Sequence, residues 1–224
     1  MIDSWLSYYQ DFLEQWPLIA SGILATIKLT LTVSVTGFAL GVLVFFLSLS
    51  RRAWVARSVE AYKSFFIGTP LICIIYILYY GLPGLGLRLS PFEVMVIGFT
   101  ANVGAYNAAY LLTAYNGLDK SQLEAATAQG FTDAQIYTSI ILPQVLRTSI
   151  PALTNQIIYN LKDSSIAFLV QYPEFFARMQ ELAGGNFEFF KTYTLTAVFY
   201  VLLASAVFFA ARALERRNAR LSWE

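Results

Sequence analysis

The sequence predicts an all-α integral membrane protein with five transmembrane helices. Of its 224 residues, 57% are hydrophobic and only 13% are charged, whereas soluble domains carry about 25% charged residues. Five stretches are long and apolar enough to cross a hydrocarbon core of about 30 Å, which takes roughly 20 helical residues. The positively charged residues gather in the connections that would face the cytoplasm.

Four of the five stretches have no charged residue over at least 20 positions: residues 29–50, 64–87, 94–118 and 192–211. The remaining expected span, residues 148–170 and the fourth along the chain, contains Lys162 and Asp163 and is therefore less regular. Each stretch is expected to form one helix, because a helix satisfies all its backbone hydrogen bonds internally in lipid.

The distribution of arginine predicts that the N-terminus lies outside and the C-terminus in the cytoplasm. Cytoplasmic loops retain an excess of Lys and Arg. Arginines follow the first span (Arg51, Arg52 and Arg57) and the last span (Arg212, Arg216, Arg217 and Arg220), whereas the charges before residue 28 are all acidic. The predicted parts are an extracytoplasmic N-terminal segment (1–18), a transmembrane domain (19–217) and a cytoplasmic tail (218–224).

Composition excludes several kinds of chemistry. The chain has no histidine and one cysteine, Cys73, so it offers neither a zinc site, a histidine-based catalytic triad nor an internal disulfide. It also lacks the Gly-x-x-x-x-Gly-Lys-Ser/Thr loop that cradles nucleotide phosphates. No catalytic residue, metal ligand or cofactor of its own is therefore expected.

The connection between the third and fourth spans, residues 116–147, carries the most specific pattern. Good helix formers fill residues 122–143 and are interrupted by Gly130. This predicts a helix, a turn and a second helix, with Thr132 as the N-cap of the second. Its apolar residues recur at helical spacing: Ile136, Ile140 and Ile141. An ordinary helical hairpin on the membrane surface is the alternative.

Within this loop, Glu124-Ala125-Ala126 is followed after three residues by Gly130, and after nine more by Ile140, one residue and Leu142-Pro143. This spacing resembles the loop motif of the permease subunits of ABC importers. The resemblance implies that these residues meet a separate ATPase subunit, in which ATP and Mg²⁺ bind. Glu124 would orient the contact with the ATPase and Gly130 would shape the loop. The small side chains of Ala125 and Ala126 would allow the ATPase to approach closely.

The resemblance extends over roughly residues 19–217 to polar amino-acid permeases of the histidine, glutamine and arginine type. Three further segments carry it: Gly68-Thr69-Pro70-Leu71, Ala105-Tyr106 and Lys162-Asp163-Ser164-Ser165. It implies the type I importer permease fold in a bacterial cytoplasmic (inner) membrane. The implied partners are an ATPase dimer, a second identical or homologous permease chain and an extracytoplasmic solute-binding protein.

The polar run in the expected span at 148–170 is the candidate substrate pathway. Charges inside a membrane are costly, so they usually pair, line water or mark a transport path. Asp163 could bind the ammonium of an amino acid, and Lys162 with Ser164 and Ser165 its carboxylate. The helix is expected to loosen after Leu161. Further pathway candidates are Thr69, Pro70 and Asn155.

Purely structural alternatives stay open for these residues: an ion pair of Lys162 with Asp163, and a proline kink at Pro70. Two other functions would use the same pair. A secondary transporter would relay ions through it, and a membrane enzyme would use it as acid and base.

Three positions depart from the family pattern. Many relatives carry Glu and Arg where this chain has Ala109 and Leu112, and Arg where it has Ile67. We therefore expect selectivity to differ from that of importers for basic amino acids, unless the second permease chain supplies the charge.

Overall fold

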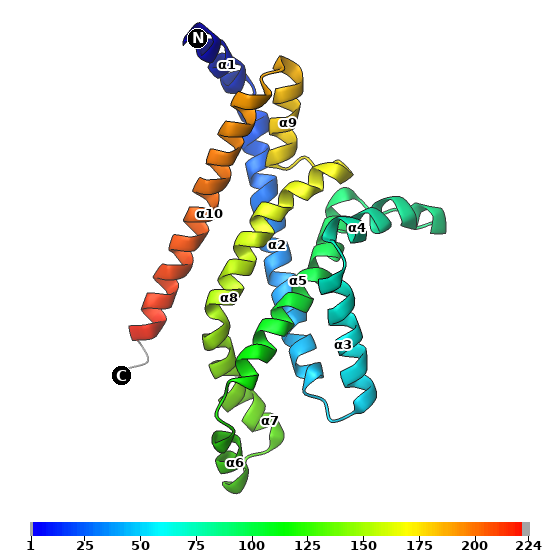
Figure 1. Cartoon of the computed structure of the whole chain (residues 1–224), viewed down its shortest axis with the longest axis vertical. Coiled ribbons are helices and arrows are strands. Elements are labelled where there is room, and N and C mark those ends of the chain that lie inside the picture. The colour runs from blue at the N-terminus through cyan, green and yellow to red at the C-terminus, as the bar shows by residue number, and fades with distance from the viewer. Residues whose placement is uncertain (1, 221–224) are drawn as a thin grey trace. The chain divides into compact units, whose positions relative to one another are not determined.

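The structure is a computed structural model that describes the backbone of residues 2–220 and the side chains of residues 5–213. All its regular elements within this range are helical (Figure 1), which confirms the predicted all-α class. The predicted tail at 218–224 lies largely outside the described residues. So do the side chains of Arg216, Arg217 and Arg220.

The described chain forms helices of very different lengths. They are α1 (Ile2–Glu14), α2 (Trp16–Ser48), α3 (Ala53–Gly68), α4 (Leu71–Tyr76), α5 (Pro91–Asn116), α6 (Lys120–Ala128), α7 (Asp133–Gln135), α8 (Leu142–Asp163), α9 (Phe175–Asn186) and α10 (Phe189–Arg220). Two π-helical segments (Ile77–Gly81 and Ile136–Ile141) and two 3₁₀ segments (Leu82–Leu85 and Ser164–Val170) complete the set.

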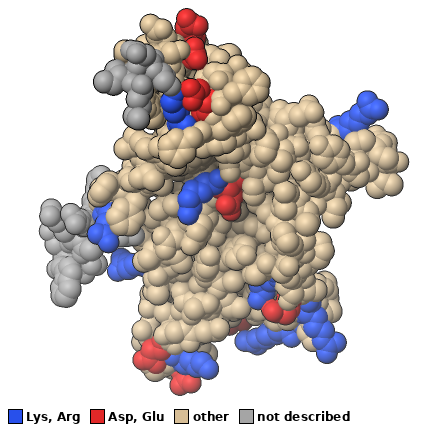
Figure 2. All heavy atoms as spheres, turned by 45° about the horizontal axis from the view of Figure 1, so that its top comes forward, with Lys and Arg blue, Asp and Glu red and all other residues tan. Residues whose placement is uncertain are grey.

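Three of the described helices are long and apolar enough to cross a membrane: α2, α5 and α10. A fourth span results if α3 and the broken segment that follows it are taken together. Helix α8 covers most of the expected span at 148–170 but is not among these three described helices. Figure 2 shows broad areas of surface with neither acidic nor basic side chains, as a membrane protein requires.

The expected span at 64–87 is wrong in its boundaries. Helix α3 begins earlier, at Ala53, and ends at Gly68, and α4 begins only at Leu71. Thr69 is extended, with φ −101° and ψ 129°. A proline clashes with an α-helical residue before it, so Pro70 forces this extended conformation. The segment is thus a break between two helices and not a kink within one.

The chain divides into two compact units. Unit 1 comprises Met1–Ser34, Leu71–Phe99 and Ile157–Glu224, and unit 2 comprises Val35–Pro70 and Thr100–Gln156. Helices α2, α5 and α8 each contribute residues to both units.

The core of unit 1 is built on α9, which contacts α1 and α10 (Figure 1). Its buried apolar residues are Tyr8, Phe12, Ile19, Phe175, Met179 and Leu182. These side chains come from α1, α2 and α9, so α9 is anchored in the chain and not loosely attached to it.

The core of unit 2 joins the 116–147 connection to the longer helices. Its buried residues are Phe45, Leu111, Ala126, Ile136, Ile141 and Val145. They come from α2, α5, α6, the π-helical segment and α8. Burying this apolar area fixes the connection to the ends of the long helices.

Close packing of α2 on α5 within unit 2 depends on Gly41. A Cβ atom there would lie 2.5 Å from the Cβ of Asn107 and 3.3 Å from the backbone oxygen of Gly104. Gly41→Val should therefore lower the unfolding free energy by about 1–3 kcal/mol. Thermal unfolding in detergent measures this, with Gly184→Val as the control, because a Cβ at Gly184 meets nothing within 4 Å. Equal melting temperatures for both variants would contradict the packing argument.

Candidate functional site

The 116–147 connection forms the predicted helix–turn–helix, which we call the hairpin. Asp119 caps α6, accepting a 2.9 Å hydrogen bond from the Ser121 amide. The backbone and side-chain hydrogen bonds from Ser121 lower the pKa of this carboxyl. The cap therefore carries a negative charge at the positive end of the α6 dipole.

Helix α6 ends in a Schellman turn centred on Gly130. The Phe131 amide donates to the Ala126 carbonyl at 3.1 Å, and the Gly130 amide donates to the Thr127 carbonyl at 3.0 Å. Gly130 has φ +82°, a left-handed conformation that costs other residues energy. Glycine is thus the residue that this turn favours at position 130.

The predicted cap at Thr132 is confirmed, and it is a full capping box. The Thr132 hydroxyl accepts from the Gln135 amide at 3.3 Å, while the Thr132 amide donates to the Gln135 side chain at 2.9 Å. Helix α7 then passes through the π-helical segment into α8. The two helices of the hairpin are therefore each held by a cap.

Removing this cap should loosen the second half of the hairpin. Thr132→Ala is expected to cost about 1 kcal/mol of local stability, which raises amide exchange at residues 133–137 roughly fivefold. Hydrogen exchange with mass spectrometry measures it. Thr138→Ala is the matched control, because Thr138 only donates to the Ala134 carbonyl within the helix. The same exchange in both variants would contradict the role of the cap.

The hairpin presents some of the predicted coupling residues to its surroundings and buries one. Glu124, Ala125, Gly130 and Pro143 are exposed, and Leu142 is half-buried. Ala126 is only 5% exposed and packs in the unit 2 core. The small residues of α6 that leave room for a partner are therefore Ala125 and Ala128.

The polar run after α8 lies in unit 1 and changes helix type. Helix α8 continues to Asp163, two residues beyond the expected loosening at Leu161, and a 3₁₀ segment begins at Ser164. The Ser164 hydroxyl donates to the Leu161 carbonyl at 2.7 Å, and the Ser165 hydroxyl donates to the Lys162 carbonyl at 2.9 Å.

Lys162 and Asp163 are both exposed. The Lys162 Nζ lies 4.7 Å from the ring centroid of Tyr159, within cation–π range. Among the described residues, the ion pairs within 4.0 Å join Arg51 to Asp133, Lys63 to Glu60, Arg178 to Glu181 and Lys191 to Glu188. None of these ion pairs between described residues includes Lys162 or Asp163.

A groove of about 520 Å³ in unit 1 is lined by two of the predicted pathway residues, Lys162 and Ser165. The remaining lining comes from α9 and α10: Phe176, Tyr193, Thr196, Ala197 and Tyr200. This volume suits a small ligand. Sequence reasoning missed the α10 residues, although Tyr193, Thr196 and Tyr200 recur at helical spacing in an otherwise apolar span.

The other pathway candidates lie in unit 2. Thr69 is half-buried at the break between α3 and α4, and Pro70 is exposed beside it. Asn155 is exposed on α8. Neighbouring Gln156 is buried, and its side chain accepts a 3.3 Å hydrogen bond from the Tyr110 hydroxyl.

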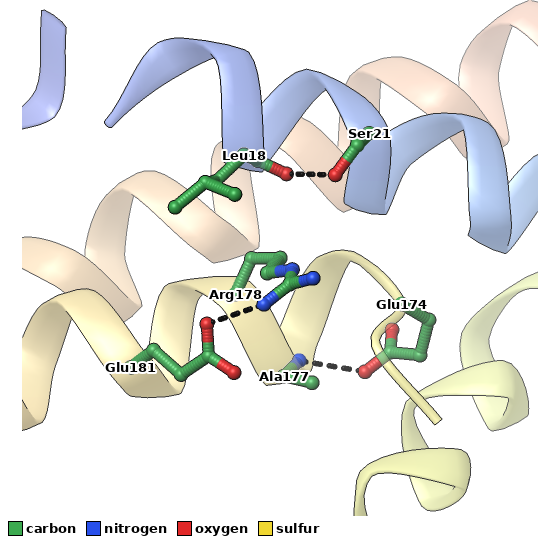
Figure 3. A network of polar contacts seen from close by, with 6 residues as sticks. All are labelled: Leu18, Ser21, Glu174, Ala177, Arg178 and Glu181. Atoms are coloured by element: carbon green, nitrogen blue, oxygen red, sulfur yellow. Dashed lines mark hydrogen bonds and ion pairs between the residues drawn. The ribbon is translucent and has the colours of Figure 1, made fainter. Parts of the chain in front are cut away.

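A buried carboxylate that the sequence did not single out caps α9 (Figure 3). Glu174 is 0% exposed. It accepts hydrogen bonds from the amides of Phe176 and Ala177 at 2.8 and 2.7 Å. On the same helix, Arg178 pairs with Glu181 at 2.8 Å. Burial raises the pKa of Glu174 to about 7, although its hydrogen bonds oppose this rise.

This raised pKa predicts that lowering the pH stabilises the protein. Between pH 4.5 and about 7, the folded state holds a proton that the unfolded state has lost, so stability falls as pH rises. Across this window the free energy of unfolding should fall by a value on the order of 3 kcal/mol. The neighbouring tyrosines do not titrate in this window. Melting temperatures in detergent should show the dependence, and Glu174→Gln should flatten it. An equal pH slope in the variant would contradict the assignment.

Comparison with known proteins identifies the family. The family described as "Binding-protein-dependent transport system inner membrane component" matches residues 37–220. The chain belongs to this family. The glutamine transport system permease protein GlnP of Escherichia coli (strain K12) is 32% identical over 213 residues, covering 92% of this chain and 97% of GlnP.

Two further relatives agree with this assignment. The L-cystine transport system permease protein TcyB of Bacillus subtilis (strain 168) is 31% identical over 213 residues, covering 94% of this chain and 91% of TcyB. A solved amino acid ABC transporter, crystallised with histidines, has a chain that superimposes with a TM-score of 0.85 at 26% identity. The match covers 92% of this chain and 96% of that one.

The chain is therefore the multi-pass permease component of an ABC importer in the inner membrane. Permease components of this family carry no cofactor, and ATP hydrolysis belongs to a separate subunit. The assignment confirms the resemblance to amino-acid permeases of ABC importers, and it decides against the secondary transporter and the membrane enzyme.

Proposed function

We propose that the chain imports a polar amino acid as one of two permease chains mounted on an ATPase dimer. The names of its relatives, which include glutamine and cystine permeases, support this substrate class. An extracytoplasmic binding protein would deliver the solute. We further propose the type I arrangement with five spans, the N-terminus outside and the C-terminus inside, in which α8 and the following 3₁₀ segment form the fourth span.

The hairpin is the observation that carries the coupling role. It is capped at Asp119 and Thr132 and is anchored by Ala126, Ile136 and Ile141 in the unit 2 core. A rigid, anchored hairpin can pass a rigid-body movement to the attached helices. Its exposed Glu124 and Ala125 would lie against the ATPase. ATP binding would then drive alternating access of the pathway.

The groove carrying Lys162 and Ser165 supports the substrate pathway. A free amino acid has an ammonium and a carboxylate, and charge-assisted hydrogen bonds recognise both. Lys162 would bind the carboxylate and Asp163 the ammonium, with hydroxyls from Ser164 and Ser165 nearby. Thr69, Pro70 and Asn155 would line other parts of the path.

Uptake into proteoliposomes containing the permease, its co-purified ATPase and the binding protein tests this proposal. We expect ATP-dependent accumulation of a polar amino acid, with glutamine, cystine, glutamate and lysine tested as competitors. Accumulation driven by an ion gradient with an inactive ATPase would contradict the proposal.

Selectivity is the second outcome of the same experiment. Ala109, Leu112 and Ile67 offer no charge for a basic side chain. We therefore expect lysine to compete weakly in a homodimer of this chain. A strong preference for lysine there would refute this part of the proposal.

A further inference from the structure

The carboxyl group of Glu174 joins three helices of unit 1. It is the N-cap of α9. The Thr26 hydroxyl of α2 donates to its Oε2 at 3.4 Å, and the Tyr200 hydroxyl of α10 donates to the same oxygen at 3.3 Å. One side chain thus links the start of α9 to two long helices.

The start of α9 lies directly against the backbone of α2. The Phe175 amide donates to the Thr26 hydroxyl at 3.0 Å. A Cβ atom at Gly22 would lie 3.0 Å from the Phe175 Cα and 3.1 Å from the Glu174 carbonyl oxygen. No side chain can therefore be added between the two segments, and their contact is close and directional.

Tyr200 connects this cap to the polar run. Its hydroxyl donates to Glu174, and its side chain lines the groove together with Ser165 of the 3₁₀ segment. Phe176, which follows the cap, lines the same groove, and its ring centroid lies 5.3 Å from that of Phe168 in the 3₁₀ segment. The carboxyl group of Glu174 thus bonds to the Tyr200 hydroxyl and the Phe176 amide, two residues of the groove wall next to this segment.

A buried acidic group is costly unless its contacts compensate for lost hydration. A threonine, serine or asparagine cap would satisfy the α9 amides at a lower cost. The carboxyl group serves more than the two α9 amides: Oε1 accepts from the Ala177 amide, while Oε2 accepts from the Phe176 amide and from hydroxyls of α2 and α10. The number of partners therefore points to a role beyond capping α9.

We propose that Glu174 is a positioning residue for transport, which holds the groove wall beside the 3₁₀ segment Ser164–Val170 in place through Tyr200 and Phe176. The inference rests on the pathway proposed above. Loss of the carboxyl group should release Tyr200, widen the motion of the 3₁₀ segment and reduce the solute moved per ATP. Hydrolysis of ATP should be less affected.

Two measurements on the reconstituted importer test the proposal. The first is the ratio of solute imported to ATP hydrolysed, and the second is amide exchange at residues 164–170. We expect Glu174→Leu and Tyr200→Phe each to lower the ratio about fivefold and to raise the exchange. The double variant should have a ratio no lower than that of Glu174→Leu, because the Tyr200 hydroxyl acts through its hydrogen bond to Glu174. Glu174→Gln, which keeps an acceptor oxygen, should retain most of the ratio.

Glu181→Gln is the matched control, since Glu181 is an exposed acid on the same helix. A merely structural role would lower uptake and ATP hydrolysis together and leave their ratio unchanged, which would overturn the proposal. The proposal would also be overturned if the fold losses of Glu174→Leu and Tyr200→Phe multiplied in the double variant. If the proposed pathway alone is wrong, Asp163→Asn will transport normally while the exchange at residues 164–170 still responds to Glu174.

Discussion

Gly130→Val is expected to reduce ATP-driven uptake at least tenfold while the protein still inserts into the membrane. Gly130 has φ +82° and closes the Schellman turn between α6 and α7. A left-handed conformation costs an ordinary residue about 1–2 kcal/mol, and a β-branched residue more. The turn should therefore open, and the exposed face of α6 should move away from its ATPase partner.

Gly130→Asn provides the matched control for this result. Asparagine tolerates the left-handed region better than other non-glycine residues, so this variant should retain much more uptake than the valine variant. Uptake and ATP hydrolysis are measured in the same proteoliposomes. We expect hydrolysis to survive in Gly130→Val better than uptake does. Full uptake by Gly130→Val would show that the turn does not transmit movement.

Asp163→Asn should lower solute transport about 10- to 100-fold. A charge-assisted hydrogen bond contributes about 1.5–3 kcal/mol, and Asp163 is proposed to hold the substrate ammonium. Lys162→Met should have an effect of similar size, because it removes the partner of the substrate carboxylate. Both side chains are exposed, so neither substitution empties a packed core.

The measurement is the initial rate of uptake as a function of solute concentration. Arg88→Met serves as a control, because Arg88 is an exposed cation outside both the proposed pathway and the hairpin. Assembly with the ATPase should be normal in all three variants. Wild-type rates for both Asp163→Asn and Lys162→Met would contradict the proposed pathway.

Local signals made the hairpin predictable. Gly130 and Thr132 act through their own backbone and their immediate neighbours, so residue type and spacing were sufficient to predict the turn and the cap. The burial of Ala126 could not be predicted in this way. It results from packing against residues such as Phe45 and Ile141, which are far away in the sequence.

Helix boundaries in the membrane were predicted less well. The charge at Lys28 placed the first span at residue 29, yet α2 begins at Trp16. A lysine can stay inside a helix when its long side chain finds a suitable partner, and Lys28 Nζ lies 4.6 Å from the Phe92 ring centroid. The role of Glu174 was hidden for a related reason, since its partners Thr26 and Tyr200 are distant in the chain.

The hairpin is proposed as the contact through which the ATPase moves this permease. Site-directed cross-linking in the assembled importer tests it most directly, with the exposed Cys73 first replaced by serine. We expect Ala125→Cys on the hairpin to cross-link to the ATPase subunit, whereas Ser165→Cys in the groove should not. An active complex in which Ala125→Cys fails to cross-link to the ATPase would contradict the claim.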